Sequence, residues 1–349
     1  MTKIFEHNHF YTIGLVYDTP EKLKNSTSMI FPSESNAEWE TEETILKIRE
    51  TWKQLGHHVI DFPLNNHFLN HWEKNYKKCN VIHSLVEGFG SLSREAWIPS
   101  LCELSGLPLI GPTPYAHSIC MNKFQTKLLC QHLNIPTAPF HIILHSRDVD
   151  NIDDDFLNNF HFIKPNGEGS GMGVDEVNSI SNSKTKTKNV CEELLKKFPH
   201  GVLLEKLLNG PEYTSSFICD SIFLPIAQIE VKSGIYGLAN KGKDIMEEKV
   251  TFPVLPYSLE QIIQNGTQKL FSFLNLHDVN RMDWKCDEEG NCYFLECNTL
   301  PGLSYYYSVL PKMAFAAGFS YESFFQKILE SAMTRKNSRN LWYGKTRVQ

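Results

Sequence analysis

The side chains best suited to chemistry lie in a predicted hairpin near the C-terminal end of the chain. Asp283, Glu296 and Asn298 each offer an oxygen atom, and a Glu-Gly turn signal separates the first from the other two. Residues 296 and 298 share one face of a strand, and Asp283 can come alongside them from the paired strand. Three such oxygens suit Mg²⁺, which also binds nucleotide phosphates. Arg281 shares the face of Asp283, and a cation beside a metal can stabilise an oxyanion in acyl or phosphoryl transfer.

The alternative is an ordinary hairpin with a solvated acidic face, and two further segments weigh against it. The first, residues 161–174, predicts a strand, a glycine-rich loop and a second strand. Backbone N–H groups of the loop, with the Ser170 hydroxyl, can cradle phosphate oxygens, and Lys164 can reach them from the strand end. No Gly-Lys-Ser/Thr follows and the loop opens no helix, which excludes a P-loop and a dinucleotide fingerprint. A plain flexible hairpin would also explain this segment.

The second segment, residues 202–215, has features of a nucleotide-base site. An apolar strand runs into Glu205-Lys206, and a turn follows at Asn209-Gly210. Backbone groups near Lys206 and Leu208 can read an adenine edge while Leu208 packs on the ring. Glu205 and Glu212 can accept hydrogen bonds from the exocyclic amine and the ribose hydroxyls. A strand with a surface Glu-Lys pair is the alternative.

Composition limits the class of protein. The 349 residues are enough for two or three domains, and 41% hydrophobic with 21% charged residues is ordinary for a globular protein. The net charge of −6 gives no indication of a nucleic-acid partner. No apolar run approaches a membrane span and the first residues lack a signal-peptide core, so a cytoplasmic protein is expected. The nine scattered cysteines predict buried, reduced thiols.

Strands and helices alternate in the first third of the chain. Strands are predicted at residues 12–17, 58–62 and 81–85, with an amphipathic helix at 41–55 between the first two. This β-α-β alternation favours a parallel sheet. A helix capped by Ser93 follows, and a boundary is placed after residue 112.

The rest of the chain is less regular. One helix is predicted from about Ala116 to His132, and a strand from His141 to Leu144. Residues 179–188 are predicted to form a polar surface loop. Residues 335–349 are predicted to be a fraying polar tail.

The order and spacing of these motifs resemble the ATP-grasp enzymes, and within them the D-alanine–D-alanine ligase family. A Lys-Pro glycine-rich hairpin is followed by Leu-Glu-Lys, Gly-Pro-Glu, Arg-x-Asp and Leu-Glu-x-Asn-Thr-x-Pro-Gly, and the resemblance covers about residues 81–329. It implies an α/β (α+β) fold with a three-domain ATP-grasp architecture and an N-terminal parallel-sheet domain. The implied parts are an N-terminal domain at 1–112, a central subdomain at 113–208, a C-terminal subdomain at 209–334 and a polar tail at 335–349. ATP would lie between the central and C-terminal parts.

The resemblance implies a role for each matched residue. The ATP contacts would be Lys123, Lys164, Ser170, Glu205, Lys206, Leu208, Glu212 and Lys241. The metal ligands, for two Mg²⁺ or for Mn²⁺ in their place, would be Asp283, Glu296 and Asn298. Arg281 and the backbone at Gly302 would stabilise a tetrahedral oxyanion, and Ser170 would close over the phosphates and the substrate. Ser308 would hold the carboxylate of the second amino acid.

The implied reaction has two steps. A carboxylate attacks the γ-phosphate of ATP and gives an acyl phosphate and ADP; an amine then attacks the acyl carbon and releases phosphate. Both steps concentrate negative charge, so metals and lysines provide most of the catalysis. The partners would be small amino acids, the product a peptidoglycan precursor, and the assembly a homodimer.

Two substrate-reading motifs of this family are absent. Its Gly-Gly-x-Ser-x-Glu turn, whose glutamate holds the ammonium group of the first D-alanine, is replaced by residues 16–22 of different sequence. Its His-Gly-x-x-Gly-Glu-Asp-Gly stretch is replaced by a segment that offers Glu87, Arg94 and Glu95. These three can recognise a charged substrate, or they can simply start a helix with favourable charge. D-alanine ligation, ligation of other carboxylate and amine pairs, and non-catalytic ATP binding therefore stay open.

Overall fold

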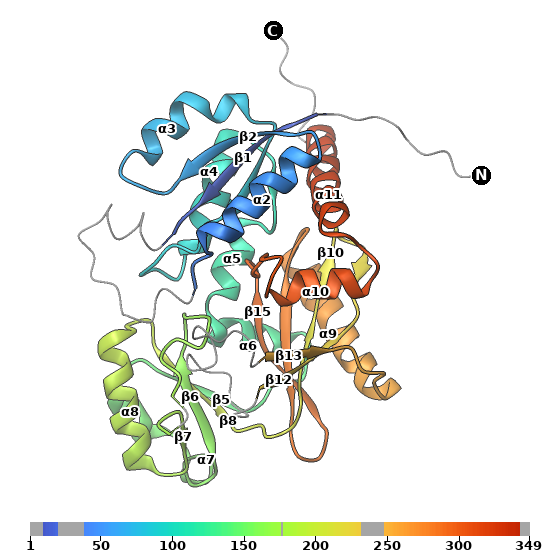
Figure 1. The fold of residues 1–349 in the computed structure, drawn as a ribbon. Coiled ribbons are helices and arrows are strands. Elements are labelled where there is room, and N and C mark those ends of the chain that lie inside the picture. Colours follow the sequence, from blue (N-terminus) through green and yellow to red (C-terminus); the bar gives the residue numbers. More distant parts are fainter. Residues whose placement is uncertain (1–9, 20–37, 176, 232–247, 343–349) are drawn as a thin grey trace.

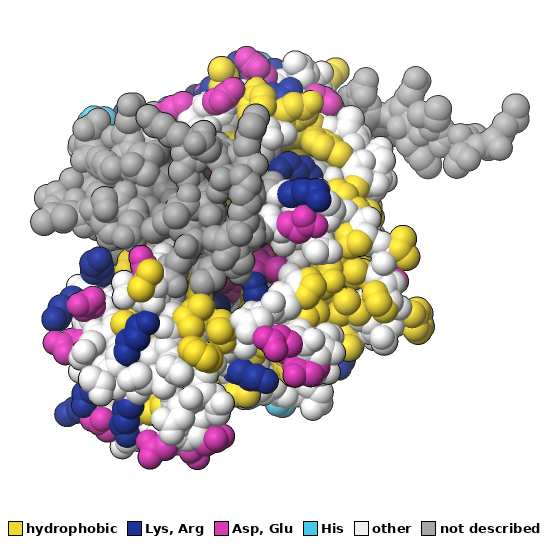
Figure 2. All heavy atoms as spheres, turned by 60° about the horizontal axis from the view of Figure 1, so that its bottom comes forward, with side chains coloured by type: hydrophobic (Ala, Val, Ile, Leu, Met, Phe, Trp, Pro, Cys, Tyr) yellow, Lys and Arg dark blue, Asp and Glu magenta, His cyan; other side chains and the backbone are white. Residues whose placement is uncertain are grey.

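The computed structural model describes residues 10–19, 38–175, 177–231 and 248–342 (Figure 1). Lys241, one of the expected ATP contacts, lies outside these residues. No helix of the described ranges is both long and apolar enough to cross a membrane. On the face drawn in Figure 2, acidic and basic side chains are intermixed over the described surface. All nine cysteines are free thiols, and all but Cys219 are buried, as predicted.

The N-terminal part is a parallel sheet covered by helices, as the alternating pattern predicted. Its strands have the order β2-β1-β3-β4, and every pair is parallel. They are β1 (Thr12–Tyr17), β2 (His58–Pro63), β3 (Val81–Leu85) and β4 (Leu109–Ile110), with helices α2 (Glu42–Gln54), α3 (Phe68–Asn75) and α4 (Trp97–Ser105). Thr41 begins α2, since its hydroxyl accepts a hydrogen bond from the Thr44 N–H at 3.1 Å. Ile45, Ile48 and Trp52 of this helix are buried against the sheet.

The central part holds a four-stranded antiparallel sheet and four helices among its described residues. The strand order is β5-β8-β6-β7. The strands are β5 (Phe140–Ile143), β6 (His161–Pro165), β7 (Ile180–Ser181) and β8 (Val202–Lys206), and the helices are α5 (Pro114–Cys120), α6 (Lys123–His132), α7 (Asp154–Asn158) and α8 (Lys184–Lys197). Short 3₁₀ turns occur at Tyr76–Lys78, Arg94–Ala96 and Ser146–Asn151.

The C-terminal part holds a five-stranded antiparallel sheet of order β13-β12-β9-β14-β15. Its strands are β9 (Glu212–Ser215), β12 (Ala227–Val231), β13 (Glu248–Thr251), β14 (Arg281–Cys286) and β15 (Cys292–Asn298), beside the hairpin β10 (Phe217–Ile218) and β11 (Ile222–Phe223). The helices are α9 (Tyr257–Leu274), α10 (Val309–Ala316) and α11 (Tyr321–Trp342). Helix α11 returns to the N-terminal sheet (Figure 1), where Phe325 packs edge-on against Trp52 at 5.0 Å between ring centroids.

Five local predictions are wrong. Ser93 does not cap a helix with its side chain: it precedes the 3₁₀ turn Arg94–Ala96, and helix α4 begins at Trp97. The helix expected from Ala116 to His132 is two helices, because Asn122 leaves the helical conformation and caps α6 by accepting a hydrogen bond from the Gln125 N–H at 3.1 Å. The loop expected at 179–188 contains β7 and the start of α8. Helix α8 buries Thr187, Cys191 and Leu194 at helical spacing beneath a Lys/Thr-rich surface that concealed the periodicity.

The other two wrong predictions concern where an element begins or ends along the chain. The second strand expected directly after the glycine-rich loop comes later, as β7, which pairs with β6. Arg335 does not begin a tail: it lies within α11 and forms an ion pair with buried Asp278. The domain boundaries at 112 and 208 stay predictions.

Candidate active site

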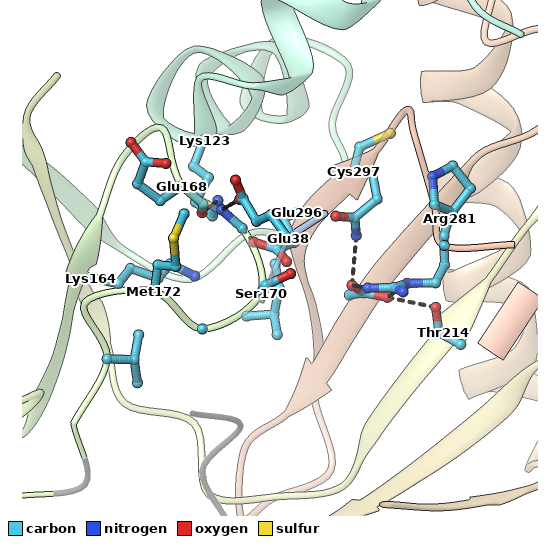
Figure 3. Close-up of a pocket in the computed structure, with 18 of the residues that line it drawn as sticks. Glu38, Lys123, Lys164, Glu168, Ser170, Met172, Thr214, Arg281, Glu296 and Cys297 are labelled. Carbon is cyan, nitrogen blue, oxygen red and sulfur yellow. Dashed lines mark hydrogen bonds and ion pairs between the residues drawn. The ribbon is translucent and has the colours of Figure 1, made fainter. Parts of the chain in front are cut away.

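A cavity of about 630 Å³ is lined by residues from all three parts of the chain. The expected site residues that the structure describes all line it, with the exception of Arg94. Side chains from the N-terminal segment, the glycine-rich loop, the central sheet and the C-terminal hairpin thus meet in one space (Figure 3). The structure therefore brings together motifs that the sequence could place only one at a time.

The C-terminal hairpin has the predicted register. Asp283 lies directly opposite Glu296, and Arg281 opposite Asn298. Arg281 donates to both oxygens of Asp283, at 3.0 Å and 2.9 Å, and the Asn298 amide nitrogen donates to the same carboxylate at 2.9 Å. From β9, Thr214 donates to Asp283 Oδ1 at 2.6 Å. The Asp283 carboxylate is thereby fixed in position by three neighbours.

A β-bulge changes which residues of β15 face the cavity. The pairing shifts between Asp283 and Trp284, so that Trp284 lies opposite Phe294 and Leu295 is the extra residue. Leu295 and Glu296 are adjacent in sequence, and both line the cavity. Strict alternation would have turned one of them away.

Lysines concentrate positive charge beside this hairpin. Lys123 Nζ lies 3.3 Å from Glu296, which is visible in Figure 3. Although burial alone would raise it, the pKa of Glu296 is lowered to about 2 by Lys123, Lys164 and Arg281. The carboxylate is therefore an anion at any working pH of the protein.

Glu205 lies between two lysines. Its oxygens are 2.5 Å from Lys164 Nζ and 2.8 Å from Lys127 Nζ, and the side chain is 4% exposed. Burial opposes the charge, but Lys127 and Lys164 lower the pKa of Glu205 to about 2. This carboxylate pairs with two lysines, and its predicted contact with an adenine amine stays a prediction. Lys127 was missed as a site residue, although its place four residues after Lys123 on a predicted helix was a usable signal.

An apolar wall lies next to these charges. Phe162 pairs with Ile180 on one side and with Glu205 on the other, so the three share one face of the central sheet. Leu208 is buried and also lines the cavity. Across the cavity, Glu212 forms an ion pair of 3.1 Å with Lys285. Apolar side chains bordered by polar groups suit a flat heterocycle.

The glycine-rich loop has the left-handed backbone that phosphate-binding loops use. Ser170 has φ +53°, and Gly171 and Gly173 have φ +71° and +68°. Asn166 ties the loop to the start of α6, because its side-chain oxygen accepts from the Phe124 N–H at 2.9 Å. The loop thus has a fixed base and a backbone able to surround an anion.

The segment that follows the hairpin is closely packed. A Cβ at Gly302 would lie 2.7 Å from Ser308 Oγ, so no larger residue fits without movement. The Ser308 hydroxyl accepts from the Ser304 N–H at 3.0 Å and can still donate to a ligand. The Leu303 N–H donates to Glu40 at 3.0 Å.

Glu38 and Glu40 are site residues that the sequence analysis missed. Both line the cavity from the segment that precedes α2. The family motif predicts a carboxylate directly after β1, whereas Glu38 and Glu40 lie just before Thr41, the residue that caps α2. The helix cap at Thr41 was the feature of the sequence that could have drawn attention to these two residues.

Glu87, Arg94 and Glu95, which stand where the family has its second substrate-reading motif, differ from one another in their position relative to the cavity. Glu87 lines the cavity, and its backbone N–H and that of Gly88 donate to buried Asp18 at 3.2 Å and 2.7 Å. Glu95 accepts a hydrogen bond of 2.9 Å from Thr299. Arg94 is 1% exposed, pairs with Glu38 and does not line the cavity.

The expected metal ligands fit a hard cation. Two carboxylates and an amide from facing strands supply oxygen donors, and the Asn298 nitrogen is used by Asp283, which leaves its oxygen available. Among the described residues no group of three or more His, Cys, Asp or Glu could hold a metal, so a site with three protein ligands at this hairpin would include Asn298. The positive charges of Lys123 and Arg281 balance the two carboxylates.

Comparisons with known proteins identify the family of this chain. Residues 129–330 match the family model described as the D-ala D-ala ligase C-terminus. The D-alanine–D-alanine ligase of Nitrosospira multiformis is 30% identical over 243 residues, covering 69% of this chain and 76% of that one. The corresponding ligase of Syntrophotalea carbinolica is 27% identical over 292 residues, covering 83% and 90%.

Solved structures show the same fold. The Bacillus anthracis D-alanine–D-alanine ligase complexed with ATP has a TM-score of 0.72 at 20% identity, covering 94% of this chain and 99% of that one. The VanG D-Ala:D-Ser ligase of Enterococcus faecalis has a TM-score of 0.70 at 18% identity, covering 93% and 100%. The expected ATP-grasp architecture is confirmed. The chain belongs to the D-alanine–D-alanine ligase family, whose members are ATP-dependent enzymes that form a carbon–nitrogen bond.

Proposed function

We propose that this protein activates the carboxylate of one D-alanine with ATP and joins it to the amino group of a second. The observation that carries the proposal is the single cavity in which the glycine-rich loop, the lysines, the acidic hairpin and Ser308 meet. The product would be a peptidoglycan precursor, made in the cytoplasm by a homodimer. Relatives that bear this activity in their names cover most of the chain.

The nucleotide would lie along the central sheet. Phe162 and Leu208 offer apolar surface for the base, while Lys206 and Glu212 supply polar groups beside it. Lys123, Lys164 and Ser170 would hold the phosphates, and Lys241 would add a contact from outside the described residues. The γ-phosphate would then lie beside the acidic hairpin, which is supported by the contacts of Lys123 with both the loop and Glu296.

Asp283, Glu296 and Asn298 would hold Mg²⁺, which when bound offsets the negative charge that develops during phosphoryl transfer. Arg281, held against Asp283, would stabilise the oxyanion that forms when the amine attacks, together with the backbone at Gly302. Ser308 would donate a hydrogen bond to the carboxylate of the second amino acid. Lys312, which lines the cavity one helical turn beyond, would add positive charge there.

Glu87 would receive the ammonium group of the first amino acid. Burial, together with the negative charges of Glu95 and Glu38, raises the pKa of Glu87 well above its usual range. An incoming ammonium group would relieve this accumulation of negative charge. The family's own turn glutamate is absent, so a carboxylate from a different segment would serve this role.

The test is phosphate release from Mg·ATP with D- and L-amino acids and small amines, with product masses measured in parallel. D-alanyl-D-alanine should form together with phosphate. A different condensed mass would keep the reaction class and reassign the substrates. Glu296→Gln should abolish turnover, and Glu192→Gln, at an exposed ion pair on α8, is the matched control. Persistent turnover of Glu296→Gln would contradict the proposed metal site.

A further inference from the structure

Three buried charged side chains join the N-terminal part of the chain to the glycine-rich loop. They are Glu38, Arg94 and Glu168, and their side chains are 6%, 1% and 6% exposed. We propose that Arg94 is a positioning residue which, with these two carboxylates, holds the loop closed over the acyl phosphate and keeps water from it. This inference rests on the proposed ligase function.

The contacts of this cluster, here named the Arg94 clamp, are made to consecutive loop residues. Arg94 Nη1 donates to the Gly167 carbonyl at 2.8 Å, and Nη2 lies 3.4 Å from the Glu168 carboxylate. Glu38 accepts from Arg94 Nη2 with both oxygens, at 3.1 Å and 2.9 Å. The Gly169 N–H donates to Glu38 Oε1 at 2.6 Å. Two residues from the N-terminal part therefore hold three successive residues of the loop.

The loop can approach this closely because two of those residues have no side chain. A Cβ at Gly169 would lie 2.8 Å from Glu38 Oε1, and one at Gly167 would lie 2.4 Å from a methyl group of Leu92. The glycines therefore serve the docking of the loop on the N-terminal part as well as the binding of phosphate.

The charges make the clamp sensitive to the loss of the arginine. The Arg94 guanidinium group interacts with the carboxylates of both Glu38 and Glu168. Its contacts with Glu38 are shorter and involve both carboxylate oxygens. Without Arg94, two buried carboxylates would face each other with no shared cation, which favours separation of the loop. Lys123 would offset this only in part, since its ammonium group donates its hydrogen bond to the Glu168 carbonyl and acts on the carboxylate through charge alone.

When the loop is not held closed, the acyl phosphate is exposed to water and can be hydrolysed. In an open site, a water oxygen bonds to the acyl carbon of the intermediate, the bond from that carbon to the phosphate oxygen breaks, and phosphate leaves with the electron pair. The donor carboxylate is regenerated and the water protons go to solvent. Such a cycle releases phosphate and makes no carbon–nitrogen bond.

The experiment compares phosphate released with dipeptide formed. Wild type should give one phosphate per product, and Arg94→Met should give at least about threefold more. Arg94→Lys, which keeps the charge but loses the forked geometry, should fall between them. Arg49→Met is the control, because Arg49 pairs with Asp61 in the same part of the chain and has no ion pair with any described residue of the loop. Its ratio should equal that of wild type.

A ratio of one in folded Arg94→Met would overturn the inference. If that variant does not fold, Glu168→Gln carries the test, since it leaves the Arg94–Glu38 pair intact. Amide hydrogen exchange at residues 166–174 gives a reading that needs no turnover. Faster exchange there in the clamp variants than in Arg49→Met supports the clamp, and equal exchange contradicts it. Absence of turnover in wild type with every substrate pair would count against the proposed function alone.

Discussion

Lys123 is the first residue of helix α6, and its ammonium group lies 3.3 Å from Glu296 of strand β15. This pair links the loop that would bind phosphate to the hairpin that would bind metal, because Lys123 Nζ also donates to the Glu168 carbonyl at 2.5 Å. One ammonium group therefore contacts both the loop and the hairpin.

Loss of this lysine should weaken catalysis with little effect on folding. Lys123→Met removes a positive charge from the phosphates and from Glu296, so kcat/KM for ATP should fall on the order of 100-fold. Steady-state kinetics at saturating amino acid measure it. Lys196→Met, at an exposed pair on α8, should behave as wild type. An unchanged kcat/KM for Lys123→Met would remove this residue from the site.

Glu205 should matter for stability. Glu205→Gln leaves Lys127 buried without its carboxylate, and Lys127 is 0% exposed. The free energy of unfolding should drop by about 3 kcal/mol, measured by urea denaturation. The control Glu192→Gln should stay within about 0.5 kcal/mol of wild type, and a similarly small change for Glu205→Gln would contradict the central role of this pairing.

Stability should depend on pH through Asp18. Burial raises the pKa of Asp18 to about 7, despite hydrogen bonds from the backbone at Gly88 and Glu87 that lower it. Between about pH 4 and pH 7 the folded state holds a proton that the unfolded state has lost, so stability should fall as pH rises through this window. Thermal melts of Asp18→Asn should show a shallower fall than wild type, while the exposed substitution Asp155→Asn should leave the slope unchanged. Equal slopes in all three proteins would argue against Asp18.

Gly302 and Ser308 should show coupled effects. Gly302→Ala places a methyl group 2.7 Å from Ser308 Oγ and should cost about 2 kcal/mol of stability. Ser308→Ala in the same chain removes that oxygen and should restore part of the loss, although activity should stay low because the acceptor carboxylate loses its donor. A double-mutant cycle measures the coupling, and simple additivity would show that the two residues do not interact.

Much of the local structure followed from spacing alone. The strand at 12–17, a helix close to residues 41–55 and the hairpin that brings Asp283 alongside Glu296 are short-range consequences of residue periodicity and a turn. The start of helix α8 was wrongly predicted as a loop, because its many lysines and threonines hid the helical spacing of its buried residues.

The sequence by itself determined which groups were available for chemistry: the acidic hairpin, the glycine-rich loop and the lysines near it. The tertiary structure decided which of them meet. Glu38 faces Gly169 across a long stretch of chain, Lys127 pairs with Glu205, and Arg94 turns from the cavity to the loop. These pairings depend on how separate sheets and helices pack, and on which buried charge finds a partner. Residue spacing cannot fix them, because they join segments whose relative position is set only when the whole core is formed.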